Sequence, residues 1–152
     1  MFSWEIFNIK ETRMRKEKFV SYHFVKSEDL NHHGTLFAGR AAEWFVETGL
    51  MTTSFYVPAD NIVMVNIHQM SFYQPIHLGD LIRCTGEVVL AGRTSFMVYL
   101  RFEVQGELRV EGFIRYVNVD EKGKSFPHQI QLDLTDPEII ELNQKARKFL
   151  EK

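Results

Sequence analysis

The chain has 152 residues, of which 45% are hydrophobic, 13% aromatic and 25% charged, proportions that are typical of one folded globular domain. The formal net charge of -2 excludes nucleic-acid or acidic-membrane binding that depends on the charge of the whole molecule. Cys84 is the single cysteine, which excludes an internal disulfide and a multi-cysteine zinc site and fits a reducing compartment.

The N-terminal stretch MFSWEIFNIKETRMRKEKF, residues 1–19, mixes acidic and basic side chains and lacks the apolar run of a signal peptide. No stretch approaches the ~18 consecutive apolar residues of a membrane-spanning helix. We therefore expect a cytoplasmic protein with no nucleic-acid and no membrane partner. We expect a single domain over residues 1–152, with its core at about 12–126.

The first half of the chain predicts one strand and one long helix. The run FVSYHFV at 19–25 is rich in aromatic and β-branched residues, which favours a strand. A helix is predicted from Ala38 to Phe55, and Pro58 ends this region. At 100° per residue its packed face consists mainly of small residues, namely Ala38, Ala41, Ala42, Phe45, Gly49 and Thr53. A curved sheet wrapped around the helix would provide the close neighbour that such a face requires.

The second half predicts four strands, separated by short breaks rich in turn residues, at 61–72, 81–90, 94–104 and 108–120. Gly106 and Gly123 mark a hairpin and the exit from the last strand, a spacing typical of an antiparallel meander. Asp136 stands directly before Pro137 and predicts the start of a tail helix at about 136–151. Its narrow apolar stripe places that helix at the surface or against a partner.

One helix with a small-residue face and an antiparallel sheet of five to six strands make an α+β fold, with the helix on one side of the sheet. A single sheet leaves its edges and its outer face uncovered. We therefore expect a homo-oligomer formed by pairing with a second copy of the chain.

The stretch NHHGTLFAGRAAEWF, residues 31–45, carries more polar groups than a helix start requires, because one capping side chain would suffice. The N–H groups of Ala38, Gly39 and Arg40 are expected to be unpaired, so they would stabilise the developing oxyanion of a substrate carbonyl. Gly39 would let an acyl group approach the backbone. The alternative is that Gly34 and Gly39 only shape a tight loop.

Glu43 and Glu47 lie four residues apart and are neighbours on one flank of this helix. They form either a solvated pair or a carboxylate site that holds a water in a cleft between subunits. A metal site is not expected at the adjacent His32 and His33, because no HExxH or CxxC motif supplies further ligands.

The segment AGRTS, residues 91–95, lies between two predicted strands, and Gly92 permits a turn with a positive φ. Arg93, Thr94 and Ser95 place a guanidinium and two hydroxyls at one edge of the sheet, where they could hold a phosphate. An ordinary hairpin turn is the alternative.

Three blocks stand out in the sequence, namely NHHGTLFAG at 31–39 followed by Trp44, SFYQPIHLGD at 71–80 and GRTS at 92–95. Together they resemble the acyl-CoA thioesterases of the hot-dog fold, in the cytosolic acyl-CoA hydrolase branch. The resemblance covers roughly residues 12–126.

The resemblance implies a long helix wrapped by an antiparallel sheet, two protomers that join their sheets, and dimers that often assemble into hexamers. It implies hydrolysis of acyl-CoA to a free acid and CoA, with no metal and no cofactor besides the CoA of the substrate. The amide near Gly39 would bind the thioester carbonyl, and Asn31 would orient substrate or water. The turn with Arg93, Thr94 and Ser95, together with nearby basic residues, would contact CoA. We add His33 and His68 as further candidates for substrate binding.

The sequence departs from the family at the helix acid. The family reads Trp-Met-Asp-Glu, with the first acid as the catalytic carboxylate, whereas this chain reads WFVE at 44–47 and has Val46 in that place. On a helical wheel Glu43 lies about 60° and Glu47 about 100° from Val46, which favours Glu43, while adjacency to the family's acid pair favours Glu47. Both remain candidates, and loss of hydrolysis is the third possibility.

These observations leave three hypotheses. The first is an acyl-CoA thioesterase in which a carboxylate activates water as general base. The second is a non-catalytic acyl-CoA-binding or sensing protein. The third is a hot-dog dehydratase or hydratase using His33 and Glu47, which ranks last because no FxGHFP-type block is present. His68 would either add a base at a cleft between subunits or be an ordinary half-buried histidine.

Overall fold

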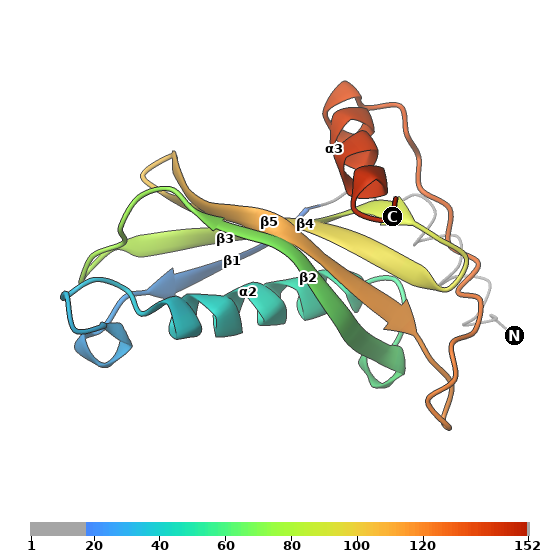
Figure 1. Cartoon of the computed structure of the whole chain (residues 1–152), viewed down its shortest axis with the longest axis horizontal. Helices are drawn as coiled ribbons and strands as arrows, with labels where there is room; N and C mark the ends of the chain where they lie inside the picture. The colour runs from blue at the N-terminus through green and yellow to red at the C-terminus, as the bar shows by residue number, and fades with distance from the viewer. Residues whose placement is uncertain (1–17, 152) are drawn as a thin grey trace, which may run out of the picture.

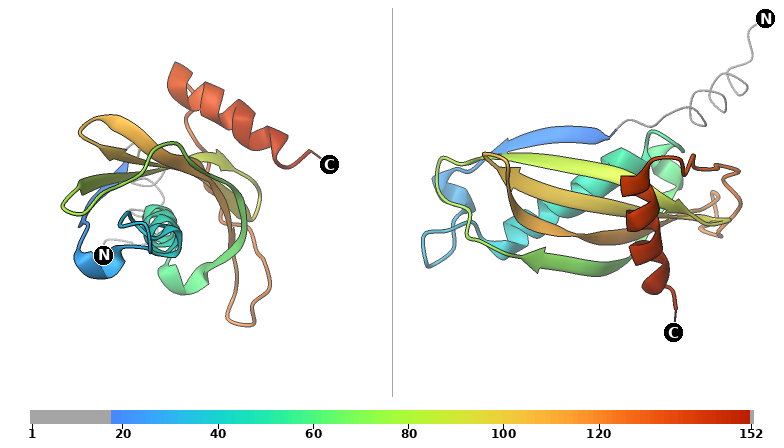
Figure 2. Two further views of the ribbon diagram at one scale, coloured as in Figure 1. Left: turned by 60° about the vertical axis from the view of Figure 1, so that its left-hand side comes forward. Right: turned by 90° about the horizontal axis from the view of Figure 1, so that it is seen from above.

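The structure is a computed structural model that describes residues 18–151. Five antiparallel strands curve around the central helix α2 (Ala38–Thr53), and a second helix, α3 (Pro137–Lys148), lies across the other face of the sheet (Figures 1 and 2). The strands are β1 (Phe19–Phe24), β2 (Ile62–Phe72), β3 (Leu81–Ala91), β4 (Ser95–Val104) and β5 (Glu107–Asn118). Their order in the sheet is β1-β3-β4-β5-β2, and short 3-10 turns occur at Ser27–Asp29 and Ala59–Asn61.

The α+β hot-dog arrangement expected from the sequence is confirmed, with five strands in the sheet. The tail helix is also confirmed, and Asp136 caps it by accepting a hydrogen bond from the Glu138 N–H at 2.9 Å. The absence of a signal peptide and the start of the core at about residue 12 were expectations that fall at least partly on residues 1–17, outside the described part of the chain. No helix within residues 18–151 is long and apolar enough to cross a membrane.

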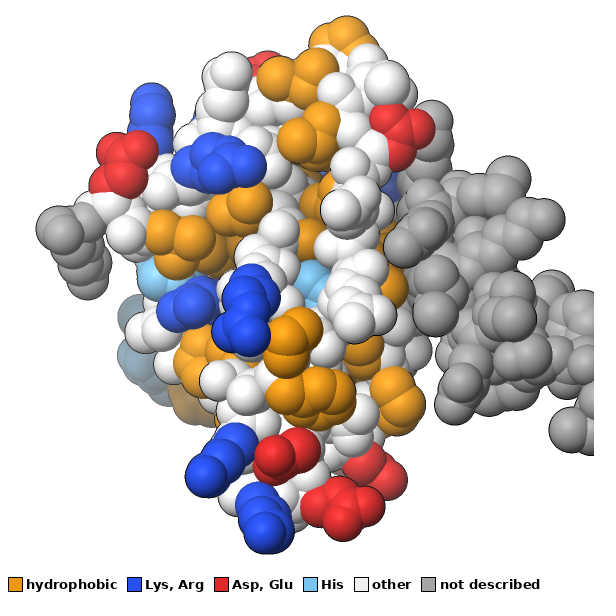
Figure 3. All heavy atoms as spheres, turned by 90° about the vertical axis from the view of Figure 1, so that its right-hand side faces the viewer, with side chains coloured by type: hydrophobic (Ala, Val, Ile, Leu, Met, Phe, Trp, Pro, Cys, Tyr) orange, Lys and Arg blue, Asp and Glu red, His pale blue; other side chains and the backbone are white. Residues whose placement is uncertain are grey.

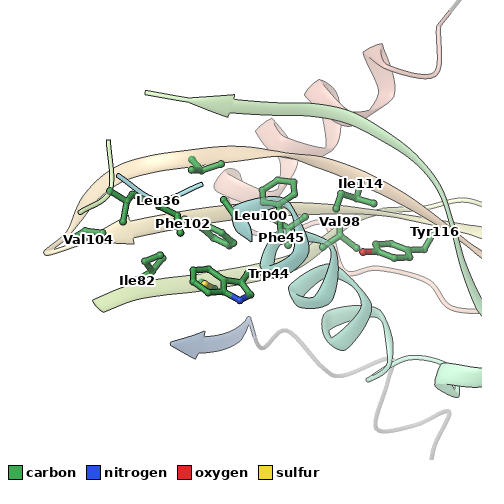
Figure 4. Packing of buried hydrophobic residues seen from close by; sticks show 14 of the residues in the cluster. Leu36, Trp44, Phe45, Ile82, Val98, Leu100, Phe102, Val104, Ile114 and Tyr116 are labelled. Carbon is green, nitrogen blue, oxygen red and sulfur yellow. The ribbon is translucent and has the colours of Figure 1, made fainter. Parts of the chain in front are cut away.

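The inner face of the sheet packs closely on α2 (Figure 4). Phe45 is fully buried and meets Phe102 of β4 edge to face, with 5.6 Å between the ring centroids. A side chain at Gly49 would collide with Tyr116 of β5, whose hydroxyl donates to the Val46 carbonyl at 2.7 Å. The small face of the helix therefore serves close approach of the sheet, as predicted.

One residue of the predicted packed face does not belong to it. Ala38 is exposed, because it is the first residue of α2 and faces a surface cavity at the end of the sheet. The residues expected on the opposite side lie away from the core centre: Glu47 is exposed, and Arg40 and Met51 are half-buried.

The tail helix α3 lies on the outer face of its own sheet. Its apolar stripe joins a cluster on the outer face that is separate from the main core and consists of Val89, Leu90, Met97, Tyr99, Phe113, Leu142 and Ala146, with Phe149 packed against it. The Phe149 ring also stacks on His68 of β2, with 5.5 Å between centroids.

Candidate active site

The loop before α2 is organised by the side chain of Asn31. Its Oδ1 accepts hydrogen bonds from the backbone N–H groups of His33 at 2.9 Å and Thr35 at 3.1 Å, while its Nδ2 donates to the Thr35 hydroxyl at 3.1 Å. Gly34 has a φ of +78°, which favours glycine and closes the turn. Asn31 is thus held in one orientation beside the start of the helix.

The first turn of α2 has no side-chain cap, since its N-cap residue is Phe37. No acceptor among the described residues takes the N–H groups of Ala38 and Gly39. The expectation that the Arg40 N–H is also unpaired is wrong, because it donates to the Phe37 carbonyl at 3.0 Å in a tightened first turn. Two donors therefore remain at the positive end of the helix dipole.

The space beside Gly39 is occupied by the ring of Phe37, which a side chain at position 39 would meet. That ring is 55% exposed, so it can turn away from the helix start. Close approach of another group to the Gly39 backbone thus depends on the rotamer of Phe37 as well as on the missing side chain.

A surface cavity of about 330 Å³ lies at this helix start. It is lined by Asn31, Thr35, Leu36, Ala38 and residues 72–76. The Leu36 N–H donates to the Ile76 carbonyl at 2.8 Å, and Thr35 pairs with His77, so the loop from the second sequence block is held beside the first. The lining includes two side-chain amides, Asn31 and Gln74, two hydroxyls, and no carboxylate, imidazole or ammonium group.

The candidate carboxylates lie apart from this cavity. Glu43 is paired with Arg40 at 3.0 Å, and its side chain is 62% exposed. Glu47 is exposed and its charge acts on His23 of β1, so it lies on the β1 side of α2. Val46 is half-buried at the margin of the core, and none of the three lines the cavity.

His23 is a residue that the sequence interpretation missed. It stacks on Trp44, with 4.4 Å between ring centroids, and both line a second cavity of about 450 Å³ at the β1 edge. Burial lowers the pKa of His23, and the nearby charges of Glu47 and Asp29 only partly oppose that shift. In β1, alternate residues face the same side of the sheet, and His23 lies opposite the buried Ile82 of β3. The alternation of FVSYHFV could therefore have predicted that His23 faces inward.

The turn of the third sequence block joins β3 to β4. Gly92 does not use the positive φ that a glycine permits. A side chain at this position would stand 2.7 Å from the hydroxyl of Ser95, which would have to shift. Ser95 is nearly buried, Thr94 is half-buried and Arg93 is exposed.

Within one protomer this turn and the Asn31 cavity lie at opposite ends of the sheet (Figure 1). The 11 residues of β3 run from Leu81, next to the cavity-side loop, to Ala91, just before the turn. At ~3.3 Å per residue the two ends are separated by more than about 30 Å. The fold therefore joins two of the three blocks and separates the third.

The two remaining candidate histidines lie outside the cavity. His33 is exposed in the loop, with its ring next to that of His32. His68 is under α3, on the face of the sheet opposite α2. Within residues 18–151 no group of three or more His, Cys, Asp and Glu side chains is arranged to hold a metal ion.

Comparisons with known proteins give a consistent result. Residues 33–111, about half of the chain, match the thioesterase superfamily. The uncharacterized acyl-CoA thioester hydrolase YkhA of Bacillus subtilis is 24% identical over 149 residues, which covers 93% of this chain and 86% of that protein.

Solved structures with this fold include an apo-hexameric acyl-CoA thioesterase, with a TM-score of 0.81, 26% identity and coverage of 94% of this chain and 91% of that one. The acyl-CoA hydrolase of Staphylococcus aureus, solved with butyryl-CoA and CoA, has a TM-score of 0.79 at 21% identity, covers 94% and 87% of the two chains, and supports the fold alone. The sequence match and the hot-dog architecture agree, and the chain belongs to the thioesterase superfamily.

Proposed function

We propose that this protein is an acyl-CoA thioesterase that hydrolyses an acyl-CoA thioester to free acid and CoA. The observation that carries the proposal is the cavity at the start of α2, which Asn31 and Ala38 line. The backbone N–H groups of Ala38 and of the next residue, Gly39, have no acceptor among the described residues. A thioester carbonyl placed there would receive hydrogen bonds that strengthen as its oxygen becomes negative.

The reaction is an attack of water on the thioester carbonyl carbon. A carboxylate removes a proton from the water as the new C–O bond forms, and the oxyanion is held by the Gly39 and Ala38 amides. Collapse of this intermediate breaks the C–S bond and releases CoA as a thiol after protonation. Asn31 would orient the water or the carbonyl through its Nδ2 group, because its Oδ1 is engaged by the loop.

The site is completed by a second protomer. β2 pairs only with β5 within the described sheet and exposes an apolar edge, in which Val63, Met64, Val65, Ile67 and Phe72 are each 41–50% accessible. An 11-residue exposed edge strand of this kind requires a partner. Antiparallel pairing with β2 of another copy reverses its direction, so the Arg93, Thr94 and Ser95 turn of one protomer approaches the Asn31 end of the other. Further assembly of dimers is supported by the hexameric state of the structurally similar thioesterase.

Glu43 is the better candidate for the general base. The charge of Glu47 acts on His23 of β1, and β1 is at the other edge of the sheet from β2, where the second protomer would bind. Glu43 lies nearer to Val46 on the helix, and Asp29 can retain Arg40 at 3.2 Å when the Arg40–Glu43 pair opens. Arg93 and Ser95 of the partner subunit would hold CoA.

A second function, binding of acyl-CoA without turnover, is favoured by Val46 and by the lack of a carboxylate in the cavity lining. A hydratase reaction has less support, because His33 does not line the cavity and His68 lies on the other face of the sheet.

The test follows thiol release from a panel of acyl-CoAs from acetyl to palmitoyl. We expect turnover by the wild type, a loss in Glu43→Gln and little change in Glu47→Gln. Val46→Asp and its uncharged control Val46→Asn complete the set. If the wild type binds acyl-CoA without turnover and only Val46→Asp hydrolyses it, the binding function replaces the thioesterase.

A further inference from the structure

A small pocket of about 160 Å³ lies between α3 and the turn that joins β3 to β4. Its lining includes Ser95 and Met97 of β4, Arg115 of β5, and Arg147 and Leu150 at the end of the chain. Figure 3 views this end of the molecule and shows basic side chains standing among hydrophobic ones. Two arginines thus share one pocket on the face of the sheet opposite α2.

The side chain of Arg115 has one hydrogen-bond donor, its Nε, without an acceptor among the described residues. It pairs with Met97 across β4 and β5, which places it on the outer face with the cluster under α3. Its Nε is buried and has no hydrogen-bond partner within residues 18–151. A buried guanidinium N–H without an acceptor is costly, so this donor favours an acceptor from outside the chain, such as a water or an anion.

Arg147 is oriented toward the same pocket by a chain of hydrogen bonds. The buried side chain of Asn143 donates to the Val89 carbonyl at 2.8 Å and accepts from the Nε of Arg147 at 2.9 Å. This anchors one of the five guanidinium N–H groups and leaves the outer edge of the fork for another acceptor. Among the described residues, no carboxylate lies within 4.0 Å of Arg115 or Arg147 to neutralise them.

We propose that this pocket binds a phosphate group through Arg115 and Arg147. Two like charges in one pocket favour an anion, and the planar guanidinium matches phosphate oxygens in pairs. The volume is below the ~300 Å³ of pockets that hold whole ligands, so the pocket suits one phosphate and not a nucleotide.

The phosphate has two possible sources. One is the 3'-phosphate of CoA, because the pocket includes Ser95 of the turn assigned to CoA. This identification rests on the proposed function. The other source is a separate phosphate-bearing molecule, for which the pocket would be an independent site. Dephospho-CoA, which lacks only the 3'-phosphate, distinguishes them.

The experiment measures binding of CoA, dephospho-CoA and inorganic phosphate to the full chain by calorimetry, with the arginine Nε resonances recorded by NMR. Arg147→Gln is the test variant, and Lys148→Gln is the matched control, because it removes the same charge from the next residue of α3, outside the pocket lining. Both residues are exposed, so neither variant is expected to unfold.

We expect Arg147→Gln to weaken CoA binding about tenfold while Lys148→Gln leaves it unchanged. Dephospho-CoA should bind equally to the wild type and to Arg147→Gln, and CoA should shift the Arg115 Nε resonance in the wild type.

If phosphate binding depends on Arg147 while CoA affinity does not, the phosphate site stands and its assignment to CoA is overturned. If Arg147→Gln and Lys148→Gln behave alike with every ligand and Arg115 Nε does not shift, the site itself is refuted. Absence of any acyl-CoA binding or turnover would contradict the proposed function alone, since inorganic phosphate still reports on the pocket.

Discussion

The inner face of the sheet packs against α2 and the outer face against α3, and the two interfaces differ in how closely the helix approaches. On the inner face, Gly49 and Gly86 leave no room for a side chain between helix and sheet. On the outer face, α3 buries only Leu142, Asn143 and Ala146 and leaves a pocket at its end. The inner interface is therefore a filled core, whereas the outer one leaves a pocket of about 160 Å³.

The largest expected effect comes from emptying the inner interface. Phe45→Ala should lower the free energy of unfolding by about 4 kcal/mol, because its ring is fully buried against Phe102. Leu142→Ala, at the less completely buried outer interface, should cost only about 2 kcal/mol. Chemical denaturation of both variants measures the two losses of unfolding free energy. Equal losses would show that the two interfaces are equally well packed.

The close approach on the inner face predicts a specific rescue. Gly49→Ala should destabilise the fold by about 2 kcal/mol, because its methyl group would collide with Tyr116. The hydroxyl is the nearest atom, so the same substitution in a Tyr116→Phe background should cost less. A double-mutant cycle of unfolding free energies tests this, and strict additivity would show that the contact does not limit the approach.

The two helices also differ at their first turns, since Asp136 caps α3 while α2 has no side-chain cap. Gly39→Ala should therefore reduce turnover about tenfold to a hundredfold by hindering access to the free N–H groups. Its effect on the melting temperature should be small, because the added methyl group meets only the movable ring of Phe37. An unchanged rate in the thiol-release assay would argue against an oxyanion role for this turn.

The smallest expected effect is a pH dependence at the outer interface. Burial raises the pKa of Glu87 above its ordinary value of 4.5, and Lys18, 3.9 Å away, only partly opposes this. The protonated form is favoured in the folded state, so its stabilisation is present below pH 4.5 and is lost as the pH rises through the raised pKa. Glu87→Gln should therefore gain stability relative to the wild type as the pH rises. Melting curves of both proteins at a series of pH values from 4.5 upward check this. A difference in stability that does not change with pH would contradict the prediction.

The sequence patterns predicted most of the helices and strands. The periodicities predicted α2 to within two residues and each strand to within about two residues at either end. Such segments are set by neighbouring residues, by turn glycines such as Gly106 and by the Asp136 cap, all of which are visible in the sequence.

The sequence predicted only some of the residues of the candidate site. Asn31 and the SFYQP loop were identified from their motifs, and the structure brings them to one cavity. His23 and the pair Arg115 and Arg147 were missed, because each acquires its neighbours from a different strand or helix.

The sequence by itself determined the elements, the small face of α2 and the family resemblance, because these depend on residue order and spacing. Only the tertiary structure decided that the Arg93 turn stands at the opposite end from Asn31, that Glu47 faces β1 and that α3 lies on its own sheet. These outcomes depend on strand order and on the path of the chain between elements, and long-range packing fixes both.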